Sequence, residues 1–243
     1  MRGLRDHDTV IRVPTLAIET SNPSAYSPRS RFQPGVALRW SDTGRCASEA
    51  VRIDDPHLDD LAAAIERLLT RERVAPQTLK TIAVSIGPGG YTATRLAVVT
   101  AKMLAEATGA RCIGVPTAEV IAARVEHHGR DFAVALASKG ETAWVTRFGA
   151  NALPLGEGSL ADAAALIALA PKLLIADAFL PDAMRRACAD AGIAIAEPEF
   201  DPNACAEVAE RHAPTDPALL VPIYPREPEA VTKWRALKRK ERI

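Results

Sequence analysis

One segment of the chain, from Ser85 to Arg95, has residue types and a spacing that could bind an anion. It reads S-I-G-P-G-G-Y-T-A-T-R, an apolar run followed by a glycine-rich turn and the start of a predicted helix. Backbone N–H groups and the helix dipole converge at such a start, which favours a phosphate or a nucleotide near Gly87, Gly89, Gly90 and Thr92. The alternative is a tight turn that lets the helix pack closely on the sheet. The lysine of a Walker loop and the third glycine of a dinucleotide fingerprint are both missing.

A second candidate position lies at the end of the first apolar run, where Glu19 and Thr20 follow T-L-A-I. Glu19 is either a polar residue of a cleft near a bound anion or a turn and capping residue. No G-x-S-x-G nucleophile turn occurs. The five histidines form no i, i+4 pair and the four cysteines no C-x-x-C pair, so neither a metal site nor a disulfide framework is expected. The sequence therefore predicts no catalytic residues, no metal and no cofactor.

The elements that must position these residues alternate along the chain. In the first half we expect strands at 15–20, 35–40, 46–53, 81–86 and 111–115, a helix opening at Asp55-Pro56 and a helix over 92–108. In the second half we expect a hairpin of 132–137 and 142–148, strands at 172–176 and 193–196, and helices at 117–126, 160–169, 181–191 and 203–212. This order predicts an α/β fold with mixed sheets flanked by helices.

Composition limits the function classes. The 243 residues carry 30 basic and 30 acidic side chains and are 48% hydrophobic, which excludes a disordered chain, a collagen-like fibre and a coiled-coil rod. No apolar run approaches the roughly 20 residues of a membrane span, and residues 1–12 lack the apolar core of a secretory signal. We therefore expect a cytoplasmic protein without membrane contact. The zero net charge argues against strong nucleic-acid binding by the whole surface.

The helix predicted over 92–108 is apolar nearly all round, because only Arg95, Thr100, Lys102 and Glu106 interrupt it. Such a helix must be covered on both faces. One face can pack on the sheet of this chain, and the other must meet another helix or another protein. The amphipathic helix after Pro56 is a candidate neighbour, and the two helices could form one interaction surface.

The C-terminal segment has a different character. From Lys233 onward it is basic, which is typical of a solvated end. The alternative is a local contact with RNA or with an acidic partner.

Several of these segments together resemble the TsaB (YeaZ) family. The similar segments are L-A-I-E-T-S near the start, an Asp-Pro-His helix start, G-P-G-G-Y-T-A-T-R, K-G-E-T-A-W and the late P-I-Y-P-R. The resemblance covers most of the chain from Thr15 to Lys233, and the Gly-Pro-Gly block is its most specific part. It implies the two-lobed actin, sugar-kinase and Hsp70-like (ASKHA) fold. We accordingly expect an N-terminal lobe at 13–115, a C-terminal lobe at 116–221, and a tail at 222–243 that returns to the N-terminal lobe.

The resemblance also implies a role without turnover by the isolated chain. TsaB-like proteins are non-catalytic partners of TsaD, the transferase that forms threonylcarbamoyladenosine in tRNA. The pairing would use helices of the N-terminal lobe, with the contact residues His57, Leu58, Leu61, Ile65, Thr94, Arg95, Val98 and Lys102. A TsaE-like ATPase is a further expected partner, and tRNA is expected to be contacted only indirectly or through the basic tail.

Two alternatives remain at this point. Catalytic ATPases of this fold carry D-x-G-[ST] after the first strand, where this chain has Glu19-Thr20-Ser21-Asn22. An active kinase or ATPase of the same fold is the first alternative, although the missing glycine argues against it. A homodimeric regulatory relative is the second, with the same helices buried across a two-fold axis.

Overall fold

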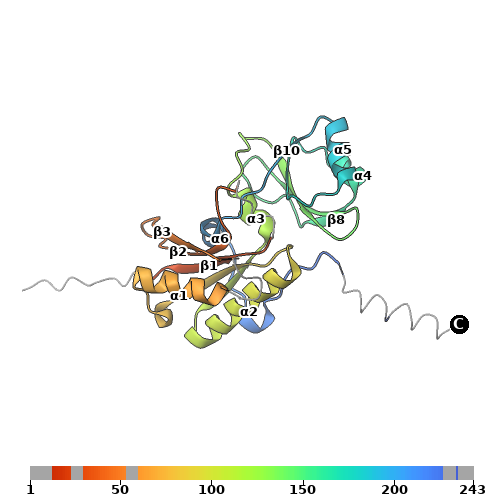
Figure 1. Cartoon of the computed structure of the whole chain (residues 1–243). Helices are drawn as coiled ribbons and strands as arrows, with labels where there is room; N and C mark the ends of the chain where they lie inside the picture. The colour runs from red at the N-terminus through yellow and green to blue at the C-terminus, as the bar shows by residue number, and fades with distance from the viewer. Residues whose placement is uncertain (1–12, 23–29, 53–59, 227–233, 235–243) are drawn as a thin grey trace, which may run out of the picture.

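The computed structural model describes residues 13–22, 30–52, 60–226 and 234. These residues form two lobes, each built on a five-stranded mixed sheet (Figure 1). The predicted α/β class with mixed sheets and flanking helices is confirmed. Within the described ranges, no helix is both long enough and apolar enough to cross a membrane.

The first lobe contains β1 (Thr15–Glu19), β2 (Gly35–Arg39), β3 (Cys46–Ala50), β4 (Thr81–Ser85) and β5 (Arg111–Val115), in the order β3-β2-β1-β4-β5. The pairs β1–β4 and β4–β5 are parallel, whereas β1–β2 and β2–β3 are antiparallel. Side chains alternate between the two faces of a strand. Leu16 and Ile18 therefore join the core under α1 (Leu61–Glu72) and α2 (Tyr91–Thr108). Ala17 joins the core under α6 (Pro202–Ala209), on the opposite face of the sheet (Figure 1).

The second lobe contains β6 (Phe132–Ala137), β7 (Ala143–Phe148), β8 (Ser159–Ala161), β9 (Leu173–Ala176) and β10 (Ala194–Ala196), in the order β10-β9-β6-β7-β8. One face packs on α4 (Ala163–Ala168) and α5 (Asp182–Asp190), and the other meets α3 (Thr117–Ala122). Two short 3₁₀ helices, η2 (Pro76–Thr78) and η3 (Pro217–Leu219), belong to connections of the first lobe.

Several element boundaries differ from the expectation, as at β3, which ends at Ala50, and α6, which ends at Ala209. The helix expected over 160–169 begins only at Ala163, because the Asp162 carboxylate caps it by accepting a hydrogen bond from the Ala165 N–H, and Leu160 lies in β8. The helix expected over 117–126 ends at Ala122. The helix α6 lies within the range expected for the second lobe, yet it packs on β1, β2 and β4 of the first. The predicted helix start at Asp55-Pro56 falls outside the described residues.

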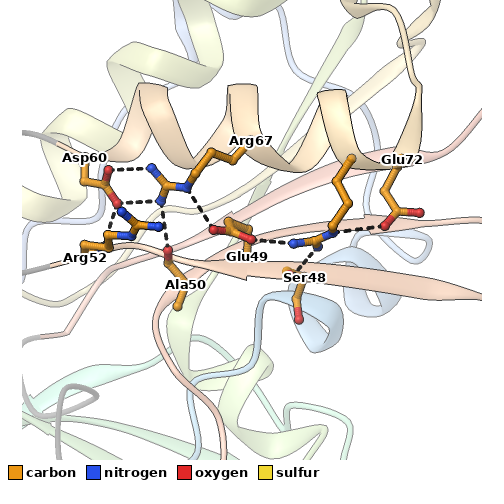
Figure 2. Close-up of polar contacts among 8 residues, drawn as sticks. Ser48, Glu49, Ala50, Arg52, Asp60, Arg67 and Glu72 are labelled. Carbon is orange, nitrogen blue, oxygen red and sulfur yellow. Dashed lines mark hydrogen bonds and ion pairs between the residues drawn. The ribbon is translucent and has the colours of Figure 1, made fainter.

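A network of ion pairs joins α1 to the edge strand β3 (Figure 2). The Arg67 guanidinium donates to both carboxylate oxygens of Asp60 at 2.8 Å and to Glu49 Oε1 at 2.9 Å. Glu49 also pairs with Arg71, which in turn reaches Glu72. Bidentate, charge-assisted hydrogen bonds of this kind are stronger than isolated surface pairs. They lower the pKa of Asp60 to about 2. The network therefore fixes the first turn of α1 against the sheet.

Replacing Arg67 with methionine keeps most of the aliphatic stem but removes these bonds. We expect the free energy of unfolding at pH 7 to fall by a small amount, because partly exposed ion pairs stabilise a fold only modestly. The pKa of Asp60 is lowered in the folded state, so the stability it contributes is present above about pH 4 and is lost as the pH falls toward 2. Urea unfolding at pH 7 and pH 3 measures this, and the gap between wild type and variant should narrow at pH 3. A gap that is unchanged at pH 3 would contradict the assignment to Asp60.

Candidate functional site

The glycine-rich loop between β4 and α2 packs against the turn that follows β1. The Gly90 N–H donates to the Ser21 carbonyl at 2.6 Å, and a Cβ on Gly89 would lie 2.0 Å from that same oxygen. Gly87 has a φ of +91°, a left-handed conformation that favours glycine. Close packing therefore accounts for Gly89, and the left-handed backbone accounts for Gly87. The N–H of Gly90 that an anion would use at this turn is bonded to Ser21.

Glu19, at the end of β1, is fully buried. Its Oε1 accepts hydrogen bonds from the Ser21 N–H at 2.8 Å and the Ser21 hydroxyl at 2.6 Å. Burial raises the pKa of Glu19 above its ordinary value of 4.5, although the bonds from Ser21 oppose the shift. The other oxygen, Oε2, has no hydrogen-bond partner within the described part of the chain. A buried carboxyl held by its own turn fits the turn interpretation of this residue better than a solvent-accessible anion or Mg-ATP site, and Thr20 is buried beside it.

The raised pKa of Glu19 predicts that the free energy of unfolding depends on pH. The unfolded chain ionises Glu19 near pH 4.5, whereas the folded chain holds the proton to higher pH. The folded state therefore loses stability as the pH rises through this window. We expect Glu19→Gln, which keeps the accepting oxygen, to gain stability relative to wild type from pH 5 to pH 8. Chemical unfolding at both pH values checks this, and a difference that stays constant would show that Glu19 is ionised in the fold.

The two lobes are joined directly beside Glu19. The Asn22 amide donates to Asp177 Oδ2 at 3.0 Å, and Asp177 also accepts from the backbone N–H of Ala137 at 3.0 Å. On the same side, Glu199 accepts from the Ser30 hydroxyl at 3.0 Å and from the Arg31 N–H at 3.1 Å. These contacts hold the two lobes together next to the turn that follows β1. The described residues also contain no group of three or more His, Cys, Asp or Glu arranged to hold a metal ion.

The outward side of α2 carries the most prominent apolar surface of the N-terminal lobe. Leu96, Val99 and Met103 follow each other at helical spacing and are exposed by 36%, 50% and 67%. Tyr91, at the start of the helix, is 64% exposed. We call Leu96, Val99 and Met103 the α2 face. A row of large apolar side chains in water is the mark of a binding surface, whereas single exposed ones are ordinary.

The residues predicted to bind the partner divide into three groups. Thr94 and Val98 lie on the inward side of α2, and Leu61 and Ile65 on the inward side of α1, all four of them buried in the core of the lobe. Arg95 is exposed and Lys102 half-buried at the surface of α2, and His57 and Leu58 lie outside the described residues. The predicted contacts Thr94 and Val98 therefore face the core and not the surface, and a partner contact through α2 stays a prediction. The small Ala97, Ala101 and Ala105 let α2 approach the sheet, which turns the larger residues outward.

Sequence reasoning missed a second part of this surface. Residues 216–224 run along α2, held by Lys102, whose ammonium donates to the carbonyls of Ala218 at 3.3 Å and Leu220 at 3.2 Å. The Ile223 N–H donates to the Ile86 carbonyl at 2.8 Å. Leu220 is buried by these contacts, whereas Leu219 and Val221 on either side of it are largely exposed. The run of three consecutive apolar residues at 219–221 was the available signal.

Comparisons with known protein sequences identify relatives of this chain. A sequence model of the family described as TsaD, tRNA N6-adenosine threonylcarbamoyltransferase, matches residues 52–197, more than half of the chain. A Bacillus subtilis (strain 168) protein named tRNA threonylcarbamoyladenosine biosynthesis protein TsaB is 34% identical over 112 residues. This chain belongs to the family that the TsaD model describes. The Bacillus relative supports its resemblance to the TsaB (YeaZ) proteins. The Bacillus alignment covers 46% of this chain and 44% of that protein, so the chain spans less than half of that relative's length.

Two solved structures have a fold similar to that of this chain. A Pseudomonas aeruginosa protein described as similar to the peptidase YeaZ has a TM-score of 0.62 and 18% identity, over 88% of this chain and all of that one. A second structure, YeaZ from Pseudomonas aeruginosa, has a TM-score of 0.59 and 19% identity, over 87% and 99% of the two chains. The two-lobed ASKHA-like fold implied by the family resemblance is confirmed.

Proposed function

We propose that this chain is a non-catalytic subunit of the machinery that forms threonylcarbamoyladenosine in tRNA, and that it binds a TsaD-type transferase through the α2 face. The exposed row Leu96, Val99 and Met103 is the observation that carries the proposal. Membership of the family that the TsaD model describes and the name of the Bacillus relative support the choice of pathway. The role places the protein in the cytoplasm, where such a complex would meet tRNA.

The geometry supports binding more than catalysis. The turn after β1 is filled by Ser21 and the loop glycines, and Asn22 bonds Asp177 across the lobes. By contrast, the α2 face lies at the surface of a helix that the sheet holds rigidly from behind. Apolar side chains on a rigid helix bind a partner with little loss of conformational entropy. The activating effect would then come from holding the transferase in its active arrangement.

Reconstitution tests the proposal. The TsaD-type transferase of the same genome would be supplied with unmodified tRNA and threonylcarbamoyl-adenylate, with and without this chain and with a TsaE-type ATPase present throughout. Formation of the modified nucleoside should require this chain and should be lost with Met103→Glu. Leu155→Glu is the matched control, because Leu155 is also about half exposed but lies in the second lobe. Equal product without the chain would refute the proposal, and self-association without transferase binding would favour the homodimeric alternative.

A further inference from the structure

A groove opens between the lobes at the N-terminal end of α2. Its cavity volume is about 1060 Å³, and its walls come from Pro88–Thr94 of the first lobe, Ala137–Gly140 of the second, and the C-terminal stretch Pro222–Arg226. Ligand pockets range from about 300 to 1,000 Å³, so this groove suits an extended ligand. It borders the closed contact between Asn22 and Asp177 at Ala137. Its lining does not include Leu96, Val99 or Met103, the residues of the proposed transferase contact.

Two aromatic rings stand at this groove. The rings of Tyr91 and Tyr224 have centroids 5.9 Å apart and are tilted by 41°. Both side chains are substantially exposed, Tyr91 by 64% and Tyr224 by 44%. Core packing does not explain the position of two aromatic side chains that are exposed to this degree. Exposed rings of this kind are platforms on which nucleic-acid bases stack.

Cations surround the two rings. Lys139 and Arg226 line the groove, and the Arg226 guanidinium donates to the Thr142 hydroxyl at 2.7 Å. This bond anchors the guanidinium to the hairpin of β6 and β7. Arg95 donates to the Tyr91 hydroxyl at 2.7 Å, and its guanidinium lies 4.9 Å from the centre of that ring. None of the described residues that line the groove is acidic. The positive end of the α2 dipole adjoins the same wall.

We propose that this groove binds a single-stranded segment of RNA. Bases would stack on Tyr91 and Tyr224, and Lys139, Arg226 and Arg95 would neutralise the backbone phosphates, the combination that single-strand binding proteins use. Single-stranded loops expose unstacked bases, whereas the bases of a duplex are not available to the rings. The choice of RNA over another polyanion rests on the proposed function in tRNA modification.

The experiment measures fluorescence anisotropy of a labelled single-stranded RNA of about 12 nucleotides, using the full chain without any transferase. The test pair is Lys139→Gln with Arg226→Gln, and the matched control is Lys172→Gln with Arg186→Gln, two exposed cations of the second lobe. The test pair should weaken binding at least tenfold. It should also lower the slope of log affinity against log salt by about 1.4, because each single-strand phosphate contact contributes roughly 0.7.

Separate variants test the stacking of bases on the tyrosine rings. Tyr224→Ala should weaken binding about tenfold and Tyr224→Phe should restore it, because stacking requires only the ring. Phe179→Ala is the control, since Phe179 is also an exposed aromatic residue, at 58%, but does not line the groove. Equal losses in the test and control pairs, or binding of a duplex of the same sequence as tightly as the single strand, would overturn the proposal. ADP that competes at the same concentration as the RNA would also overturn it, because the site would then take a mononucleotide.

A further variant distinguishes failure of the RNA-binding proposal from failure of the proposed function. Val99→Glu lies on the α2 face outside the groove lining, so it should leave RNA binding unchanged while it removes transferase binding. If the groove variants lose RNA binding but still bind the transferase, the result supports RNA binding by the groove separately from the transferase contact.

Discussion

Glutamate at Val99 is expected to abolish transferase binding in a folded protein, whereas glutamate at the adjacent Val98 is expected to prevent stable folding. Val98 is 2% exposed and lies in the core between α2 and the sheet, and Val99 is 50% exposed on the outward side. An unpaired charge buried at Val98 should cost more than about 4 kcal/mol of unfolding free energy. The same charge at Val99 stays in water and should change stability by less than about 0.5 kcal/mol.

The effect on transferase binding is expected from the charge at Val99, which lies at the surface. A charge in the centre of an apolar interface must be desolvated when the transferase binds, so Val99→Glu should weaken the complex at least about 100-fold. Thermal unfolding and isothermal titration with the transferase measure both quantities on each variant. A Val99→Glu protein that binds like wild type would place the interface elsewhere. A stably folded Val98→Glu protein would contradict the inward placement of that side chain.

Alanine at Gly89 is the substitution expected to disturb the lobe most without adding a charge. Its Cβ would lie 2.0 Å from the Ser21 carbonyl oxygen, so the loop and the β1 turn must separate. This separation also lengthens the bond between the Gly90 N–H and the same oxygen. We expect a loss of about 3 kcal/mol or more, typical of overpacking combined with a broken buried hydrogen bond.

Gly109→Ala is the matched comparison for this prediction. Gly109 ends α2 with a φ of +69°, but no heavy atom lies within 4 Å of its added Cβ. The cost there is only that of the left-handed backbone, about 1 kcal/mol. Urea unfolding of both variants should therefore separate close packing from backbone strain. A Gly89→Ala protein as stable as Gly109→Ala would show that the loop does not press on the β1 turn.

The alternation of apolar runs and helical periods predicted the fold class and the order of nearly all elements. Boundaries were less predictable, as at Leu160, where three strand residues and a cap at Asp162 replace the expected first turn of helix. The partner face was the harder problem, because a helix that is apolar all round does not reveal which side meets the sheet. That choice depends on which side chains are small enough for close approach, here Ala97, Ala101 and Ala105.

Other features of the site depend on tertiary contacts that no local pattern encodes. The glycine-rich loop has the sequence of an anion site, yet its packing partner, the Ser21 carbonyl, is 69 residues earlier in the chain. The strand-end Glu19 was open to two interpretations from sequence, and only its complete burial favours the turn. Lys102 was expected to touch a partner directly, whereas its ammonium holds the C-terminal segment in place. That segment adds Leu219 and Val221 to the surface beside α2.

The most direct test of the α2 face is hydroxyl-radical footprinting of the chain with and without the TsaD-type transferase, read by mass spectrometry. Methionine oxidises readily where solvent reaches it. Met103 is 67% exposed and Met184 is fully buried, so the free chain should be oxidised at Met103 and spared at Met184. The complex should protect Met103 while Phe179, exposed on the second lobe, stays equally reactive. A stable complex in which Met103 is oxidised as fast as in the free chain would contradict the proposed interface.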